Sequence, residues 1–376
     1  MKLADCVEYL SRGKSPDYVD KSDITVINQA CIYWNGVNIE KAKYQNPNSI
    51  YKKAVLQDKD VLINSTGTGT LGRAAVYYNS GETAIADSHV TIVRTDKTKV
   101  VPEFLCLYLR RDIIQKELYS RCVSGSTNQV ELSKDKLLAF PVPEIPIEVQ
   151  HNLVTNLGKI SNIIAIRNEE LSALDNLIKA RFAEMFGDPI LNQKGFPVYK
   201  MDAVVEFQGG SQPDKKFFEY TPSENNVRLI QIRDYKTDNY ITYIPKSMAR
   251  RHCTADDIMI GRYGPPIFQI LQGIEGSYNV ALMKATPKMG NREFIRWFLK
   301  QECLLQYLEG LSKRTAGQDG IQMDKLKAYP VPMPPVELQD DFESFAEQIC
   351  KTKSAIQKTL DETQLLFDSL MQEYFG

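Results

Sequence analysis

The chain contains two copies of one long segment, and this duplication limits what it can fold into more than any other feature. The run FPVPEIPIEVQ at 140–150 returns as YPVPMPPVELQ at 329–339, an offset of 189 residues (140 against 329). Because solenoid repeats are only about 20–50 residues long, this period predicts two tandem domains. Further matches follow in the same order: 60–63 with 257–260, 88–94 with 278–284, 135–137 with 324–326, and 186–187 with 375–376.

The first part of each copy, about 140 residues, has the pattern of a mixed α/β domain. Runs at 61–66, 74–78 and 89–94 are rich in β-branched and aromatic residues and predict short strands, and Asn79-Ser80-Gly81 predicts a hairpin turn. A helical stretch follows at 102–118, and its counterpart in the second copy is 292–308. The expected fold class is therefore α+β, with two tandem copies of this domain.

Each copy ends in a predicted long helix. Proline lacks a backbone N–H, so PVPEIP and PVPMPP favour extended segments, and the helices begin after them. Apolar residues then recur every three or four positions over about 40 residues, which corresponds to roughly 60 Å. Such a helix cannot bury its stripe on its own domain alone, so we expect the two helices to pair as an antiparallel coiled coil.

The stripe fixes the expected packing positions and domain limits. The predicted parts are a domain at 1–143, a long helix at 144–187, a second domain at 188–333 and a second long helix at 334–376. Lys353 and Thr363 interrupt the second stripe. The packing residues are Leu153, Leu157, Ile160, Ile164, Leu171, Leu174 and Ile178 in the first helix, and Phe342, Ile349, Leu360 and Phe367 in the second.

Composition excludes several classes of protein. The hydrophobic share of 43% is that of a globular chain. No apolar run reaches the roughly 18 residues that a membrane span needs, and the first residues lack the apolar core of a signal peptide. Seven cysteines without a C-x-x-C pattern, and only three histidines, argue against a disulfide framework and against a metal centre. We therefore expect a cytoplasmic protein that binds neither a membrane nor a metal.

The formal net charge of −1 hides a segregation. Segments 1–135 and 188–335 carry +2 and +4, whereas 136–187 and 336–376 carry −1 and −6. The basic blocks coincide with the predicted domains and the acidic blocks with the predicted helices. Solvated helices are often acidic, so this pattern is equally well explained without a nucleic-acid partner.

The sequence predicts no active site. Gly67-Thr68-Gly69-Thr70-Leu71-Gly72 has the spacing of a dinucleotide fingerprint, but the strand-like RAAVYY follows it where a helix N-terminus is required. We therefore expect a glycine-rich turn there. The chain has no phosphate-binding G-x-x-x-x-G-K-[ST] motif and no paired catalytic carboxylates. His89 lies close to Asp87, but the second copy has Asn279 and Ser277 at these places, which favours a structural histidine.

Polar loops with basic residues occur in both domains and differ between the copies. Amides contact adenine bidentately and arginine contacts guanine, while lysine neutralises phosphates. Solvated surface is the simpler explanation for any single residue, but two basic domains that share a scaffold and carry different loops favour recognition of two DNA sequences. The candidates are Asn35, Asn38, Lys41, Lys43, Gln45, Asn46, Lys52, Lys53, Arg73, Thr127, Asn128 and Gln129 in copy one, and Arg233, Lys236, Lys246, Arg250, Arg251, Arg262, Arg314 and Gln318 in copy two.

This arrangement resembles the specificity (S) subunit of type I restriction-modification enzymes over the whole chain. The most specific similarities are DVLINSTGTGTLGRAAV at 60–76, the PVP-(x)3-(I/V)-E-(V/L)-Q segment of both copies, and the ends ARFAEMFG and SLMQEYFG. The resemblance implies two target-recognition domains, each contacting one half of a bipartite double-stranded DNA target. Copy two departs from the family at Tyr263-Gly264-Pro265-Pro266, where equivalent DNA contacts are not expected.

The resemblance also implies the partners. The paired helices would set the spacer between half-sites and dock two methyltransferase (M) subunits, which methylate adenine, and motor-nuclease (R) subunits can join. The chain itself would be non-catalytic and bind no cofactor, with S-adenosylmethionine, ATP and Mg on the partner subunits. Two alternatives stay open: a DNA-binding scaffold of a related phage-defence complex that does not direct methylation, and a nucleotide-dependent catalyst that uses 67–72.

Overall fold

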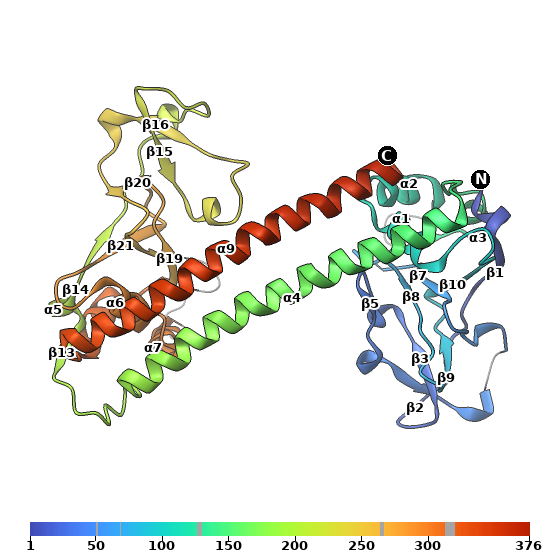
Figure 1. Cartoon of the computed structure of the whole chain (residues 1–376), viewed down its shortest axis with the longest axis horizontal. Helices are drawn as coiled ribbons and strands as arrows, with labels where there is room; N and C mark the ends of the chain where they lie inside the picture. The colour runs from blue at the N-terminus through green and yellow to red at the C-terminus, as the bar shows by residue number, and fades with distance from the viewer. Residues whose placement is uncertain (50–51, 68, 126–129, 264–266, 313–319) are drawn as a thin grey trace. The chain divides into compact units, whose positions relative to one another are not determined.

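The computed structural model describes residues 1–49, 52–67, 69–125, 130–263, 267–312 and 320–376. It consists of two compact units (Figure 1). Unit 1 combines Met1–Ile166 with Leu360–Gly376, and unit 2 is Arg167–Thr359. Unit 1 therefore uses residues from both ends of the chain. The mixture of sheets and long helices confirms the predicted α+β class.

Each unit contains a four-stranded antiparallel sheet with the same strand order. The order is β1-β10-β7-β8 in unit 1 and β14-β21-β18-β19 in unit 2. The repeat in the sequence is therefore a repeat in the fold. The strands are β1 Val7–Arg12, β7 Val61–Asn64, β8 Ala74–Val76 and β10 Val90–Thr95, and β14 Val205–Gly209, β18 Ile258–Gly261, β19 Gln269–Gln272 and β21 Leu282–Pro287.

A second sheet in each unit carries most of the candidate loops. Its order is β2-β6-β3-β9 in unit 1 and β16-β15-β20-β17 in unit 2, and each has one parallel pair, β3 with β9 and β15 with β20. Short ladders β4–β5, β11–β12 and β13–β22 complete the β-structure among the described residues. The strands are β2 Tyr18–Val19, β3 Ile24–Ile27, β4 Ile32–Tyr33, β5 Gly36–Val37, β6 Lys43–Gln45, β9 Thr83–Ala86, β11 Val123–Ser124, β12 Glu131–Leu132, β13 Val198–Lys200, β15 Asn226–Ile230, β16 Tyr243–Pro245, β17 His252–Cys253, β20 Gly276–Tyr278 and β22 Pro330–Pro332.

The turn at Asn79–Gly81 does not close a hairpin, so that prediction was wrong. It joins β8 of one sheet to β9 of the other. The Asn79 side chain accepts a hydrogen bond from the Gly81 N–H at 2.9 Å, and the main-chain N–H of Asn79 donates to the Asp58 carboxylate at 3.0 Å. An Asx turn of this kind redirects the chain whether or not the flanking strands pair.

Two short helices stand where each copy predicted one helical stretch. In unit 1, Arg111 is extended (φ −65°, ψ 137°) and separates α1 from α2. Strand β7 shows how the first sheet is buried on both faces, since Val61 and Ile63 pack with these helices and Leu62 packs against the second sheet. The short helices are α1 Pro102–Arg110, α2 Asp112–Cys122, α3 Lys134–Leu138, α5 Met201–Val204, α6 Arg292–Leu299, α7 Glu302–Ser312 and α8 Met323–Ala328.

The two long helices are α4 Ile147–Phe186 and α9 Val336–Phe375, each of 40 residues. In unit 2 they run antiparallel, because Phe182 packs on Phe342 with ring centroids 5.4 Å apart, while Asp175, earlier in α4, pairs with Lys353, later in α9. In unit 1 the helix segments share a core with the sheet and α1. The predicted packing residues of both helices are buried or half-buried: Leu153, Leu157, Ile160, Ile164, Leu171, Leu174, Ile178, Phe342, Ile349, Leu360 and Phe367.

Candidate nucleic-acid interface

Two predicted cations lie against the ring of Tyr33, the last residue of β4. Lys41 donates to the hydroxyl of Tyr33, and its Nζ lies 5.1 Å from the ring centroid. The guanidinium of Arg73 lies 5.6 Å from the same centroid and donates to the carbonyl of Ile32 at 3.3 Å. Cation–π contacts hold both charges at fixed positions while leaving donors free for phosphate or base edges. The fold thus joins residues that are 32 positions apart in sequence (41 against 73).

A second cation–aromatic pair lies on β2 and β6. The Nζ of Lys43 is 4.7 Å from the ring centroid of Tyr18, whose hydroxyl donates to Asp87 at 2.8 Å. Burial, together with the Asp87 carboxylate, raises the pKa of Tyr18. The phenol therefore stays neutral and keeps its hydrogen bond at physiological pH. Tyr18 and Lys43 are both exposed and form a small aromatic and cationic surface.

Three of the predicted amides stabilise the loop itself. Gln45 is fully buried, where it accepts from the Asp17 N–H at 2.9 Å and donates to the Ser49 carbonyl at 3.0 Å. Its burial removes it from the DNA-contact candidates. The Asn38 side chain accepts from the Glu40 N–H, and that of Asn46 donates to Asp17 and accepts from the Asn48 N–H.

Asn35 remains exposed and lines an open hollow of about 410 Å³ together with Tyr33, Gly36, Val37 and Asn38. Lys53 is also exposed, and its carbonyl accepts from the Tyr9 hydroxyl. The remaining candidates of copy one, Thr127, Asn128 and Gln129, lie outside the described residues, as does the side chain of Lys52.

Unit 2 uses the same chemistry in a different loop. Arg233 donates to the Thr242 hydroxyl at 3.2 Å and lies 5.8 Å from the ring centroid of Tyr240. Beneath it, the carboxylate of Asp234 is fully buried and faces Arg228 at 3.8 Å and Arg233 at 4.0 Å. Burial raises the pKa of Asp234, although the hydrogen bond from the main chain of Gln231 and the charges of Arg228 and Arg233 each lower it.

Arg262 lies 5.3 Å from the ring centroid of Tyr263, and its guanidinium donates to the carbonyl of Val280 at 3.4 Å. Arg251 is half-buried and uses its carbonyl to accept from the Tyr278 N–H. Three candidates are exposed and the last two lie outside the described residues. The exposed ones are Lys236, Lys246 and Arg250, and the undescribed ones are Arg314 and Gln318.

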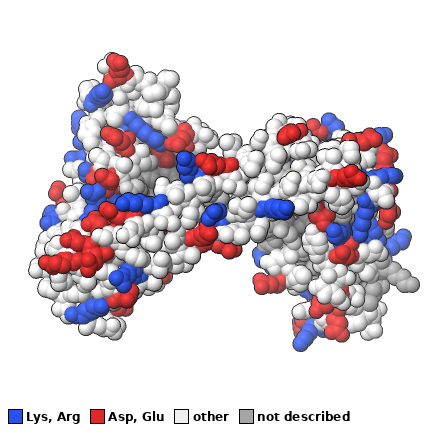
Figure 2. All heavy atoms as spheres, in the orientation of Figure 1, with Lys and Arg blue, Asp and Glu red and all other residues white. Residues whose placement is uncertain are grey.

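The tyrosines are the site residues that the sequence analysis missed. Tyr18, Tyr33, Tyr240 and Tyr263 each lie against one or more of the predicted cations. The signal was present, because tyrosine is frequent (19 residues) and stands close to basic residues in both loops. Figure 2 shows basic and acidic side chains mixed over the visible face of each unit, while acidic residues gather at the N-terminal end of α9.

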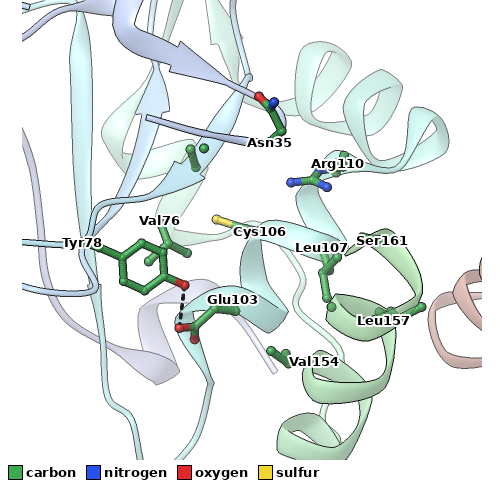
Figure 3. Close-up of a pocket in the computed structure, with 13 residues that line it drawn as sticks. Asn35, Val76, Tyr78, Glu103, Cys106, Leu107, Arg110, Val154, Leu157 and Ser161 are labelled. Atoms are coloured by element: carbon green, nitrogen blue, oxygen red, sulfur yellow. Dashed lines mark hydrogen bonds between the residues drawn. The ribbon is translucent and has the colours of Figure 1, made fainter. Parts of the chain in front are cut away.

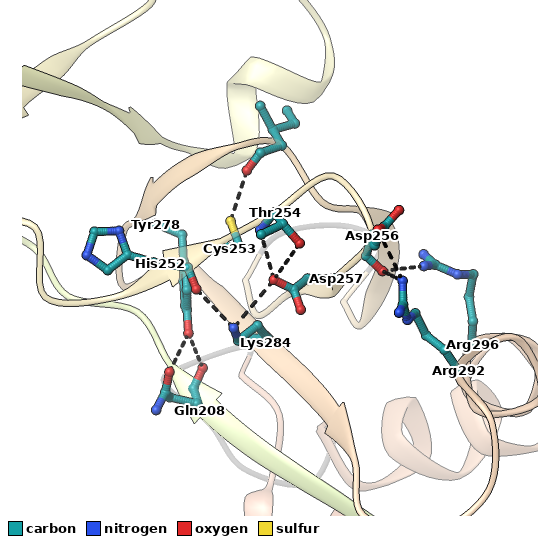
Figure 4. A network of polar contacts seen from close by, with 11 residues as sticks. Gln208, His252, Cys253, Thr254, Asp256, Asp257, Tyr278, Lys284, Arg292 and Arg296 are labelled. Atoms are coloured by element: carbon teal, nitrogen blue, oxygen red, sulfur yellow. Dashed lines mark hydrogen bonds and ion pairs between the residues drawn. The ribbon is translucent and has the colours of Figure 1, made fainter. Parts of the chain in front are cut away.

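In both units an acid–base pair joins the residue before one strand of the first sheet to the neighbouring strand. In unit 1, Arg94 on β10 donates through Nε and Nη2 to the buried Asp60 at 2.8 Å each. In unit 2 the matching residues are Lys284 and Asp257, at 3.4 Å (Figure 4). The bidentate contact of Arg94 fixes the position of Asp60 more strictly than the single ammonium contact of Lys284 fixes that of Asp257.

The remaining motifs agree with structural roles. β8 follows the turn that ends at Gly72, so no helix N-terminus is available for a pyrophosphate. His89 bonds to the Thr66 hydroxyl at 2.9 Å. Across the described part of the chain, no group of three or more His, Cys, Asp or Glu side chains is arranged to hold a metal ion. Across the same residues, no helix combines the length and the apolar character of a membrane span.

Comparison with known proteins matches this architecture. Residues 1–176 match the family described as the type I restriction modification DNA specificity domain. A protein of Methanocaldococcus jannaschii named type I restriction enzyme MjaX specificity subunit is 24% identical over 136 residues, which are 36% of this chain and 32% of that protein. The sequence match thus spans about a third of that relative's length.

Two solved structures share the fold over the whole chain. The type I restriction-modification S subunit from M. genitalium has a TM-score of 0.62 at 11% identity, covering 100% of this chain and 95% of that one. A structure described in a study of complex assembly and conformational transition of the type I R-M system has a TM-score of 0.54 at 16% identity, covering 100% and 96%. Residues 1–176 are therefore similar to the type I restriction modification DNA specificity domain, and the whole chain shares its fold with a type I S subunit.

Proposed function

We propose that this chain is the subunit that gives a type I restriction-modification complex its DNA sequence specificity. Each unit contacts one half of a bipartite target in double-stranded DNA. The observation that carries the proposal is that the first sheets of the two units have the same strand order, whereas the units present different cation–tyrosine loops. Tyr33 with Lys41 and Arg73 belongs to one unit, and Tyr240 with Arg233 belongs to the other. A shared scaffold with different loops is what two unlike half-sites require.

The long helices have two tasks in this proposal. Their length sets the spacer between the half-sites, and their outer faces dock two M subunits. Exposed apolar side chains on the helices support docking, because Leu365 is 71% and Leu366 51% exposed in unit 1, and Leu177 is 47% exposed in unit 2. Ile163 and Ile166 add to this surface in unit 1, at 45% each.

The chemistry belongs to the partners in this proposal. The M subunits bring S-adenosylmethionine and methylate adenine, and R subunits supply ATP- and Mg-dependent steps. This chain contributes binding, orientation and spacing, and it works in the cytoplasm, where it meets DNA.

Methylome mapping with and without the gene tests the proposal. A bipartite methylated motif that vanishes on deletion, and returns on complementation, is the expected result. Exchange of residues 20–55 for those of a relative should change the first half-site alone. A motif altered in both halves, or in neither, would contradict the assignment of one half-site to each unit.

The second candidate, a scaffold that binds DNA without directing methylation, predicts an unchanged methylome on deletion. The nucleotide-dependent catalyst is disfavoured because β8, and not a helix, follows Gly72. Calorimetric titration of the chain with dinucleotides should give no heat of binding, and a saturating signal would revive that alternative.

A further inference from the structure

The tip of the β4–β5 hairpin presents an amide side chain to the surface of unit 1. The last pair of this ladder joins Tyr33 to Gly36, which leaves a two-residue turn between them. Asn35 is the second residue of the turn; it is exposed, and its side chain has no hydrogen-bond partner among the described residues. Gly36 has a φ of 145°, a region that strains L side chains, so the turn requires glycine directly after Asn35.

Two arginine side chains hold this hairpin from outside. Arg110 of α1 donates to the carbonyl of Trp34 in the turn, and Arg73 donates to the carbonyl of Ile32 at 3.3 Å. Ile32 itself is fully buried. Figure 3 shows Asn35 and the guanidinium of Arg110 at the same end of the pocket between α1, β8 and α4. The hairpin is thus supported at its tip and at its base, and Asn35 has a fixed position before any ligand binds.

The amide of Asn35 has the pair of groups that the major-groove edge of adenine requires. Its carbonyl oxygen accepts from N6 of adenine while its NH2 group donates to N7. Guanine offers only acceptors at this edge, which leaves the carbonyl oxygen without a donor, and a phosphate also accepts only. The major groove is about 12 Å wide and admits a two-stranded β-ribbon, so a hairpin tip reaches the base edges.

Positive charge lies at the base of the hairpin and not at its tip. Lys41 and Arg73 both lie against the ring of Tyr33, at 5.1 and 5.6 Å from its centroid, and Tyr33 is the residue that enters the turn. Phosphates line the rims of the groove, whereas base edges form its floor. Cations behind a neutral amide therefore match the order in which a hairpin meets phosphates and then bases.

We propose that Asn35 is a specificity-determining residue of unit 1, which reads one adenine of the first half-site from the major groove. This role rests on the proposed function and adds the base that one residue recognises. The adenine that is read differs from the one that is methylated, because a base must leave the stack to be methylated.

The test uses the complex of this chain with its M subunits and duplexes that carry the mapped methylation motif. The first half-site is the one that changes when residues 20–55 are exchanged. Each of its adenines except the methylated one is replaced in turn by 7-deazaadenine, which lacks the N7 acceptor. In fluorescence anisotropy, one replacement should weaken binding of the original complex about tenfold and leave binding of the Asn35→Ala complex unchanged.

Two further variants make the test specific. Asn48→Ala is the matched control, because Asn48 is an exposed amide of the same polar stretch but lies on the separate turn Pro47–Ser49, and it should keep the full response to 7-deazaadenine. Asn35→Asp cannot donate to N7 but accepts from N4 of cytosine, so its preference at that base pair should shift from adenine to cytosine. Because Asp suits the same turn, this variant carries the test if Asn35→Ala has a lowered melting temperature.

Three results would overturn the role of Asn35 while the proposed function stands. One is an equal response of the original and Asn35→Ala complexes to every replacement, and another is a loss of response in Asn48→Ala instead. The third is a first half-site without any A·T pair besides the methylated one. A methylome that is unchanged on deletion of the gene would instead overturn the proposed function, and the role of Asn35 with it.

Discussion

The side chain of Gln150 accepts a hydrogen bond from the main-chain N–H of Val101 at 3.0 Å, and this bond joins α4 to the start of α1. The amide nitrogen of Gln150 donates to the carbonyls of Lys99 at 2.9 Å and Ile145 at 2.7 Å. In unit 2, Gln339 accepts from the Asn291 N–H at 2.9 Å. The last residue of the repeated PVP motif therefore attaches each long helix to its own domain.

Replacing either glutamine should destabilise its own unit. Gln150 and Gln339 are buried, so Gln150→Ala or Gln339→Ala leaves main-chain groups unpaired at a cost of about 1–3 kcal/mol. Urea unfolding followed by circular dichroism measures the loss. The exposed Gln348 on α9 is the matched control, and its alanine variant should change the free energy of unfolding by less than about 0.5 kcal/mol. Equal effects at all three positions would contradict the attachment role.

The glycines that follow β1 and β14, the matching strands of the two first sheets, should not tolerate a methyl group. A Cβ on Gly13 would lie 2.1 Å from the Ala86 carbonyl oxygen, and one on Gly210 would lie 1.9 Å from that of Asn279. Main-chain atoms cannot move aside easily, so Gly13→Ala and Gly210→Ala should each cost about 1–3 kcal/mol or more. Gly310 in α7 has nothing within 4 Å, and Gly310→Ala should be neutral or stabilising. The melting temperatures of the three variants test this prediction.

The ion pair between Lys353 and Asp175 should contribute more to the specific pairing of α4 with α9 than to the free energy of unfolding. Both side chains are partly exposed, at 27% and 46%, so Lys353→Ala should cost less than about 1 kcal/mol and depend on salt. Lys353→Glu places two carboxylates together and should cost more, and adding Asp175→Lys should restore most of the loss. A double-mutant cycle at low and high salt measures the coupling energy. A coupling energy of zero would mean that the two side chains lie close together without stabilising each other.

Much of the architecture could be predicted because it depends on patterns that repeat. The 3–4 spacing of apolar residues produced both long helices, and their stripes are the buried faces. The hairpin predicted at Asn79–Gly81 failed because a turn motif specifies local geometry and not which strands pair. The break between α1 and α2 at Arg111 was not predicted either, because no proline or glycine marks it in the sequence.

The candidate interface was less predictable because exposure depends on tertiary contacts. Gln45 and Asn35 are both side-chain amides in one polar stretch of the sequence. Gln45 is nevertheless buried and bonded to Asp17 and Ser49, whereas Asn35 is exposed. The approach of Arg73 to Tyr33 requires a fold that joins distant loops, so no local pattern reveals it. Cationic and amide residue types alone therefore overestimate the number of DNA contacts.

Arg73→Ala should weaken DNA binding at the first half-site by about tenfold or more. The guanidinium lies over Tyr33 and retains donors for a base edge or a phosphate. Fluorescence anisotropy with the assembled complex and its mapped target measures the effect, and Lys43→Ala should also reduce the dependence of affinity on salt. Lys97 is exposed in the same unit but outside this loop, and it serves as the control. Equal losses from Arg73→Ala and Lys97→Ala would show that charge alone matters.

Buried thiols should make unit 1 sensitive to alkaline pH. Burial raises the pKa of Cys6 and Cys122 from about 9.0 to about 11. Between these values the unfolded chain releases protons that the folded chain keeps, so stability is fully present below pH 9 and falls as the pH rises toward 11. Each thiol contributes a slope of up to about 1.4 kcal/mol per pH unit.

Urea unfolding under reducing conditions at pH 8, 9 and 10 measures this slope. Cys122→Ala should make the slope shallower, and Cys6→Ala combined with it should reduce the slope further. The single variant loses packing as well, but that loss is constant with pH and shifts the whole curve without changing its slope. If the doubly substituted chain loses stability above pH 9 as steeply as the original, the alkaline sensitivity arises elsewhere, and Cys106 and Cys31, whose thiol pKa burial also raises, become the groups to test.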